Sequence, residues 1–262
     1  MALRLLFLLF LIVPLHADDD SWYNKINVKM ELGVYKPTLL GDIKNLVSTA
    51  SFKDDFKYND ARASNFILTI QPEYDYWPNL EISYFNMHSE KGIGLAKPIK
   101  IANGFFSSAI YTKIDYQVAS FIFYQDFKLK GSKVYFFGMP FYSGDLEFDV
   151  GLNTHTFKWN FDIQNLSDLT QPPSWIRANA FIFSPYLGFK YYFYAFRLNA
   201  SASVIAFSKV KSSVYKTSFD YTLIDDLYIS AGYLYEEFKV QEQGDRINFI
   251  TSGYTVSFKY TF

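Results

Sequence analysis

The chain has 262 residues, a formal net charge of −1 and no Cys, and 50% of its residues are hydrophobic and 21% aromatic. The near-neutral charge gives no support for a nucleic-acid partner, and the lack of Cys excludes disulfides, thiolate metal sites and lipid attachment at an N-terminal Cys. The length fits one large domain or two small ones, and no linker divides it.

The first segment, residues 1–17, reads "MALRLLFLLFLIVPLHA". Arg4 is followed by an apolar run from Leu5 to Leu15, which is too short to cross a bilayer as a helix. A basic residue, an apolar run and Ala17 at the end predict a cleaved secretory signal, with a buried hydrophobic helix as the alternative. The mature chain is then expected to be exported and to comprise residues 18–262.

The mature chain is organised in segments whose polar and apolar residues alternate with the period of a β-strand. In chain order they are 28–35, 66–71, 80–85, 110–119, 146–153, 181–190, 196–206, 218–223, 227–235 and 254–262. A soluble sandwich and a membrane barrel can both give this pattern. The apolar face carries few charges and many aromatics, while the polar face mixes charge with Gly, Ser, Thr and Asn, which favours a barrel with apolar residues outside.

The sequence therefore predicts an all-β fold, a closed antiparallel transmembrane β-barrel of ten strands, with twelve or eight as alternatives. The long stretch 127–144 stands where a short turn is expected, so it could hide a hairpin. An even number of strands places both ends of the barrel chain on the periplasmic side and lets the last strand pair with 28–34.

The connections between the segments alternate in length, as in outer-membrane barrels, where periplasmic turns are short and extracellular loops are long. The expected short turns are 74–79, 191–193 and 224–226, and the expected long loops are 37–62, 91–105 and 164–176.

Several stretches carry a resemblance: "ELGVYKP", "WPNLEISYF", "YQVASFIFYQDF", "LEFDVGLN", "SPYLGFKYYF", "LIDDLYISAGYLYEEF" and "SGYTVSFKYTF". Their order resembles a family of uncharacterised small bacterial outer-membrane β-barrel proteins. The terminal Phe262, with Tyr260 and Phe258 on the same face, resembles the signal that hands such chains to the barrel-assembly machinery. The resemblance implies a location in the cell outer membrane and no known activity.

The partners expected from this reading are the secretion translocon and the barrel-assembly machinery during biogenesis, and outer-membrane lipid and lipopolysaccharide afterwards. A monomer without a cofactor is expected.

Charges of both signs alternate with the apolar positions and are expected to form a network inside the barrel. The expected members are Lys29, Glu31, Glu81, Lys113, Asp115, Glu147, Asp149, Lys190, Arg197, Lys216, Asp220 and Lys259. Enclosed charges are costly unless they are paired, so their near balance predicts salt bridges across the lumen. Ten or twelve strands lie near the filled end of the barrel size range, which favours a plugged lumen over a narrow selective pore.

Catalytic and metal-binding residues are not expected. The mature chain has two histidines, His88 and His155, both expected toward the outer rim, and a Ser next to a His in a strand points to the opposite face. The acidic residues of 51–60 are interleaved with lysines, which favours a solvated loop over a cation site.

Three functional readings remain. The preferred one is a non-enzymatic barrel that is structural or passes small solutes. The alternatives are a barrel enzyme acting on lipid or peptide at the outer rim, and a binder of hydrophobic solutes that uses Phe85, Phe121, Phe123 and Tyr186 as inward aromatics.

Overall fold

The computed structural model describes residues 26–44, 48–58, 61–72, 77–101, 104–136, 139–142, 144–166, 168, 170–206, 210–242 and 245–262. The predicted signal segment, residues 1–17, lies outside the described residues. None of the described residues forms a helix with the length and hydropathy needed to span a bilayer.

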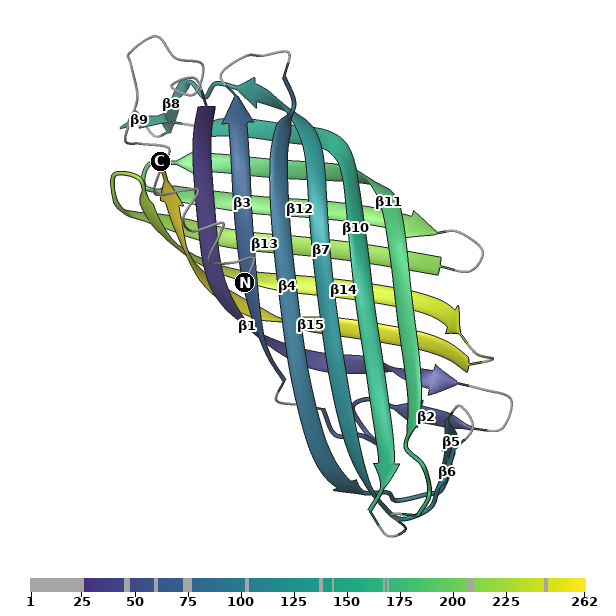
Figure 1. Ribbon diagram of the computed structural model, residues 1–262. Coiled ribbons are helices and arrows are strands. Elements are labelled where there is room, and N and C mark those ends of the chain that lie inside the picture. The colour runs from purple at the N-terminus through teal and green to yellow at the C-terminus, as the bar shows by residue number, and fades with distance from the viewer. Residues whose placement is uncertain are drawn as a thin grey trace, which may run out of the picture.

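Ten long strands form one closed antiparallel sheet (Figure 1). They are β1 (Ile26–Lys44), β3 (Arg62–Pro72), β4 (Asn79–Gly94), β7 (Ala109–Leu129), β10 (Asp145–Asn165), β11 (Ser174–Phe193), β12 (Phe196–Ala206), β13 (Val210–Ile224), β14 (Leu227–Glu242) and β15 (Asp245–Thr261). Each pairs with the next long strand along the chain, and β15 pairs back with β1. The predicted all-β fold and its ten strands are confirmed.

Closure occurs where the sequence predicted it. Met30 lies opposite Tyr260 and Val34 opposite Val256, and the amide of Phe262 donates a hydrogen bond of 2.8 Å to the carbonyl of Val28. The end of the barrel that holds Ile26 and Phe262 is called the terminal end below, and the opposite end the distal end.

Five short strands lie outside the regular barrel order. β2 (Thr49–Ser51) pairs with the distal end of β1, β5 (Ile99–Ile101) pairs with β6 (Gly104–Phe106), and β8 (Lys133–Phe136) pairs with β9 (Met139–Tyr142). The β8–β9 hairpin is the one suspected in 127–144, but it forms a sheet of its own, so it does not raise the barrel to twelve strands.

The strands are longer than the alternation suggested. β1 continues to Lys44, so much of the expected loop 37–62 is strand, and the turn expected at 191–193 lies at Tyr194 and Ala195 instead. The alternation continues through 37–44 with Leu39 and Ile43 buried. Most of its outward residues, Thr38, Asp42 and Lys44, are polar, so the segment has the composition of a loop.

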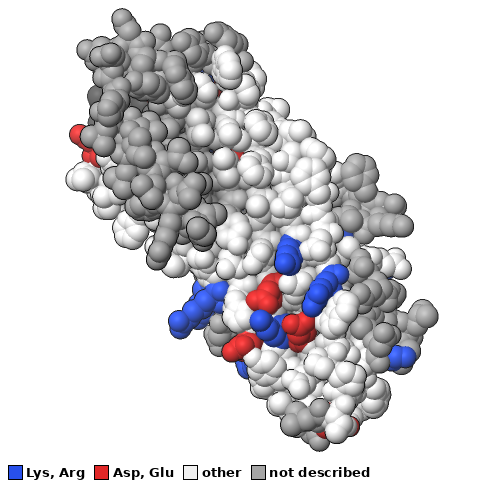
Figure 2. Space-filling view, in the orientation of Figure 1, with Lys and Arg blue, Asp and Glu red and all other residues white. Residues whose placement is uncertain are grey.

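The polarity of the two sheet faces reverses partway along the barrel, as β7 shows. In its terminal half Phe121 and Phe123 face outward, but in its distal half Ile114 is buried and Lys113 and Asp115 face outward. Figure 2 shows the same change on one side of the molecule, where charged side chains gather over the distal half. The terminal half is thus apolar outside and the distal half is apolar inside.

A packed aromatic core fills the distal half. Phe52 and Phe56, from the chain that follows β2, are fully buried against Trp159 and Phe161 of β10. β10 and β15 stand five places apart in either direction around the ten-stranded sheet, yet the rings of Trp159 and Phe249 are 5.7 Å apart. Aromatic side chains from opposite walls of the barrel therefore meet across the lumen.

Part of β11 extends beyond its neighbour. β10 pairs with β11 from Ser174 onward, but the pairing of β11 with β12 begins only at Tyr186. Within the described strands, Ser174–Pro185 therefore has a ladder on one side only. Pro185, which lacks an amide hydrogen, stands at the last residue of this stretch, where proline is tolerated.

Candidate functional site

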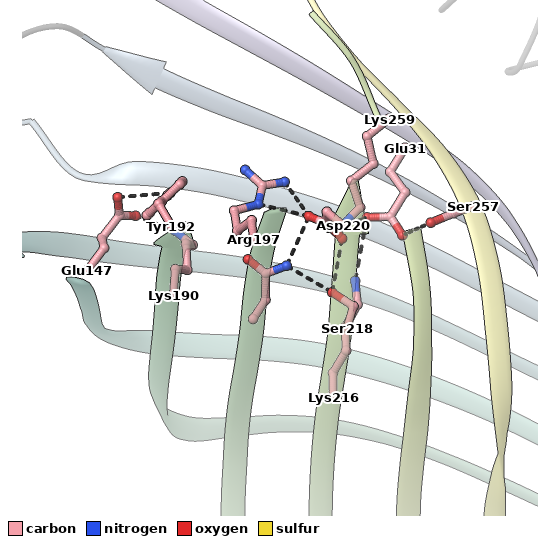
Figure 3. A network of polar contacts seen from close by, with 11 residues as sticks. Glu31, Glu147, Lys190, Tyr192, Arg197, Lys216, Ser218, Asp220, Ser257 and Lys259 are labelled. Atoms are coloured by element: carbon pink, nitrogen blue, oxygen red, sulfur yellow. Dashed lines mark hydrogen bonds and ion pairs between the residues drawn. The ribbon is translucent and has the colours of Figure 1, made fainter. Parts of the chain in front are cut away.

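The lumen of the terminal half is built around the carboxylate of Asp220 on β13 (Figure 3). Nε and Nη2 of Arg197 donate hydrogen bonds of 2.8 and 2.5 Å to Oδ2 of Asp220, and Nζ of Lys259 donates one of 2.8 Å to Oδ1. Asn199 Nδ2 adds a bond of 2.9 Å. Asp220 has no exposed surface, so two cations and an amide replace the water that the carboxylate loses.

Lys259 connects this group to a second carboxylate, Glu31 on β1. Its Nζ lies 3.5 Å from Oε2 of Glu31, and Nζ of Lys216 lies 3.6 Å from the same oxygen. The hydroxyl of Ser257 donates a hydrogen bond of 2.7 Å to the other oxygen. The network therefore links β12 and β13 to β15 and β1 across the closing seam of the barrel.

A third cluster lies on β10 and β11. Nζ of Lys190 is 2.5 Å from Oε1 of Glu147 and 2.9 Å from Oδ2 of Asp149, and it lies 5.1 Å from the centre of the Tyr124 ring. Gly188 makes room for this group, because a Cβ there would come within 2.7 Å of Oδ2 of Asp149. A larger residue at position 188 would therefore displace the carboxylate of Asp149.

A cavity of about 110 Å³ is lined by residues of these three clusters together with Lys29 and Glu81. Lys29 and Glu81 form no ion pair with another residue in the described part of the chain. The ten lumen residues named here, five cations and five carboxylates, have a formal charge sum of zero. A second cavity of about 90 Å³, lined by Asn153, Glu236 and others, lies beyond it.

The structure brings together ten of the twelve charges expected in the lumen. Lys113 and Asp115 are the exceptions, and their placement in the lumen was wrong. Both face outward on the distal half of β7, where Nζ of Lys113 lies 3.3 Å from Oδ2 of Asp115. The error follows from the reversal of polarity, because here the charged positions are on the outer face.

Asp115 belongs to an exposed cluster on the outer wall. Nδ1 of His88 lies 2.5 Å from Oδ1 of Asp115, and Nε2 of His88 lies 3.9 Å from Glu90. Burial by itself raises the pKa of Asp115, but hydrogen bonds from His88 and Lys113 outweigh it and lower the pKa below its usual range. No serine or threonine hydroxyl is among the described contacts of this His–Asp pair.

His155 does not lie at the outer rim, where the sequence reading put it. It faces the lumen, is 1% exposed, and its Nε2 lies 3.1 Å from Oγ of Ser212. Ser212 is also buried, so this Ser–His pair is sealed from a substrate outside the barrel. No local signal marks Ser212 as the partner, because it is 57 residues away in sequence.

Two of the four aromatics suggested for binding hydrophobic solutes point away from the lumen. Phe121 and Phe123 are on the outer face, whereas Phe85 and Tyr186 are buried inside. The three aromatics of the expected assembly signal, Phe258, Tyr260 and Phe262, also lie on the outer face. In the described part of the chain no group of three or more His, Cys, Asp or Glu residues could hold a metal ion.

No protein-family model matches the chain, and no curated protein sequence matches it. Among solved structures, it is similar to the outer membrane protease OmpT from Escherichia coli, with 9% identity, 90% of this chain and 97% of that chain covered, and a TM-score of 0.48. It is also similar to Ail, the attachment invasion locus protein of Yersinia pestis (7% identity, 91% and 99% covered, TM-score 0.37), and to Neisserial surface protein A (10% identity, 91% and 97% covered, TM-score 0.34).

These structure neighbours are small outer-membrane β-barrel proteins. The closed ladder from β1 round to β15 establishes the barrel independently of them.

Proposed function

We propose that the chain is an integral protein of the cell outer membrane, a non-enzymatic barrel whose lumen is closed to solutes. The single observation that carries the closure is the contact between opposite walls in the distal half. The ring of Tyr116 on β7 is 4.9 Å from that of Phe249 on β15, which leaves no room for a solute to pass between them.

The outer surface of the terminal half supports a membrane location. Its outward side chains include Val34, Phe123, Leu187 and Phe258, each of them substantially exposed. Exposed apolar surface on this scale is unfavourable in water and is expected where lipid covers it.

Aromatic residues border this band on both sides, as at the interfaces of outer-membrane barrels. On β15, Tyr254 stands on the distal side and Phe262 follows the strand at the other edge. The eight residue steps from Tyr254 to Phe262 span about 26 Å along the strand and, at a tilt of about 40°, about 20 Å along the barrel axis. This height is close to the roughly 25 Å expected for an apolar band.

Two groups of side chains, of different chemistry, close the lumen. The terminal half is occupied by the ion-paired network around Asp220, and the distal half by the aromatic core around Trp159. Hydrated ions would have to pass both. The enzyme and solute-binder readings gain no comparable support, because no hydroxyl is among the described contacts of the exposed His88 and the distal lumen is already filled.

Reconstitution separates a closed barrel from a pore. In planar bilayers we expect no steady conductance steps, and in liposomes no swelling with sugars or amino acids above that of protein-free vesicles. Heat-dependent migration on gels verifies that the barrel is folded, and a general porin in the same lipid serves as the positive control. Large and steady openings from folded protein would overturn the proposal.

A further inference from the structure

A shallow groove of about 450 Å³ lies on the outer wall across β4, β7, β10 and β11. Tyr84, Ala119, Thr156 and Phe181 line it, and the strand register places these four in one row. Small side chains on the two central strands thus stand between an aromatic ring on each flank. The groove is therefore shallow along its centre, over Ala119 and Thr156, and is bordered by an aromatic ring on each side.

The groove lies at the distal edge of the apolar band. One row toward the terminal end, Phe121 and Phe183 are outward and exposed. One row toward the distal end the outward residues are Gln117, Lys158 and Asn179, which also line the groove. The groove is therefore apolar on one side and polar on the other, within a single step of the β-ladder.

The lysine that lines the groove and the nearest outward carboxylate differ in their ion pairing. Asp115, one row further out, already contacts both His88 and Lys113. Lys158 is exposed, and in the described part of the chain neither it nor Arg62 forms an ion pair. Figure 2 shows Lys and Arg side chains exposed over the distal half, with Asp and Glu side chains between them. An anion approaching the groove therefore meets a positive charge that is not already neutralised.

We propose that this groove seats one anionic lipid of the outer leaflet, a proposal that rests on the proposed membrane location. Its acyl chain lies over Ala119 and Thr156, between the rings of Tyr84 and Phe181. Its phosphate contacts the ammonium of Lys158. The amide groups of the neighbouring row supply hydrogen-bond donors for the phosphate oxygens, and charge-assisted bonds of this kind are the stronger ones.

The test is lipid retention by the full chain. The folded barrel is prepared in mild detergent micelles that contain equal amounts of phosphatidylglycerol and phosphatidylcholine, and the lipids that remain bound are identified by mass spectrometry. We expect one phosphatidylglycerol per chain to be retained in preference to phosphatidylcholine. Equal retention of both would identify the bound lipid as ordinary boundary lipid and overturn the proposal.

Two variants address the two halves of the lipid separately. Lys158→Gln is expected to reduce the preference for phosphatidylglycerol about five-fold, the size of one lysine contact with an anionic lipid surface. Ala119→Leu raises the floor of the groove and is expected to reduce retention of either lipid. The matched controls are Lys211→Gln, an exposed lysine on β13, and Ala202→Leu, an outward alanine on β12.

If both lysine variants change the preference equally, a diffuse charge and not this groove selects the lipid, and the proposal fails. A membrane flotation assay, which measures whether the chain associates with vesicles, tests the proposed membrane location separately from the lipid preference of the groove. A chain that does not float with vesicles contradicts the membrane location itself, whereas a chain that floats and shows no preference contradicts the groove alone.

Discussion

Replacing Phe249 by Ala tests whether the distal half has a packed core. Phe249 is 2% exposed, and its ring centre lies 5.5 Å from that of Phe52, 4.9 Å from Tyr116 and 5.7 Å from Trp159. A buried Phe→Ala change costs about 3–5 kcal/mol. Because the three neighbours come from three separate segments, none can move in without leaving its own contacts, so we expect the upper part of this range. That is a large share of a total stability of about 5–15 kcal/mol.

The free energy of unfolding is measured by urea titration of the folded barrel in vesicles, followed by tryptophan fluorescence and by gel mobility. Phe105→Ala is the matched control, since Phe105 is 60% exposed and its loss should change stability by no more than about 0.5 kcal/mol. A loss below about 1 kcal/mol at Phe249, or one equal to the control, would refute the packing of opposite walls.

Two further variants test the network and the assembly residues. Asp220→Asn leaves Arg197 and Lys259 buried without their carboxylate and is expected to lower the free energy of unfolding by about 3–5 kcal/mol in the same titration. Glu237→Gln, which breaks a partly exposed pair, should cost less than about 1 kcal/mol, and equal losses would contradict a buried network. Deleting Phe262 is expected to lower the folded fraction in the outer membrane while export continues, as measured by cell fractionation, and Phe262→Tyr should assemble normally.

The number of strands and their closure could be predicted because strand alternation is a local property of the sequence. Period-two alternation identifies two faces, and pairing β15 with β1 is the arrangement that leaves no open edge. The β8–β9 hairpin was suspected from length alone. Whether the hairpin belongs to the barrel depends on its pairing with neighbouring strands, and the alternation of polar and apolar residues does not determine that pairing.

Alternation does not reveal which face is inside. On β7 the inward face carries Ile114 and Tyr116 in the distal half and Ser120 in the terminal half. A single rule that places charged residues inside along the whole strand predicts Lys113 in the lumen, but it faces outward. Phe123 was suggested as an inward aromatic, and it also faces outward. Both mistakes arise where the outer surface changes from apolar to charged.

The members of the lumen network were predictable to a large extent, but their pairings were not. Asp220 meets Arg197 on the neighbouring strand and Lys259 on another strand, 39 residues later. Which rows meet across the lumen depends on strand tilt and stagger around the closed barrel. Neither quantity can be obtained from one segment at a time.

In the proposed membrane location, the reversal of polarity on β7 would also set how deep the protein sits in the bilayer. Sliding the barrel inward would carry outward cations of the distal half, such as Arg177 and Lys113, toward hydrocarbon, where a cation costs about 2–4 kcal/mol at the midplane. Sliding it outward would expose the apolar band to water. Residues 109–118, beyond the band, span about 33 Å of strand and about 25 Å of height at a tilt of about 40°. In the proposed membrane location, the packed distal half would hold the β5–β6 hairpin beyond the lipid surface.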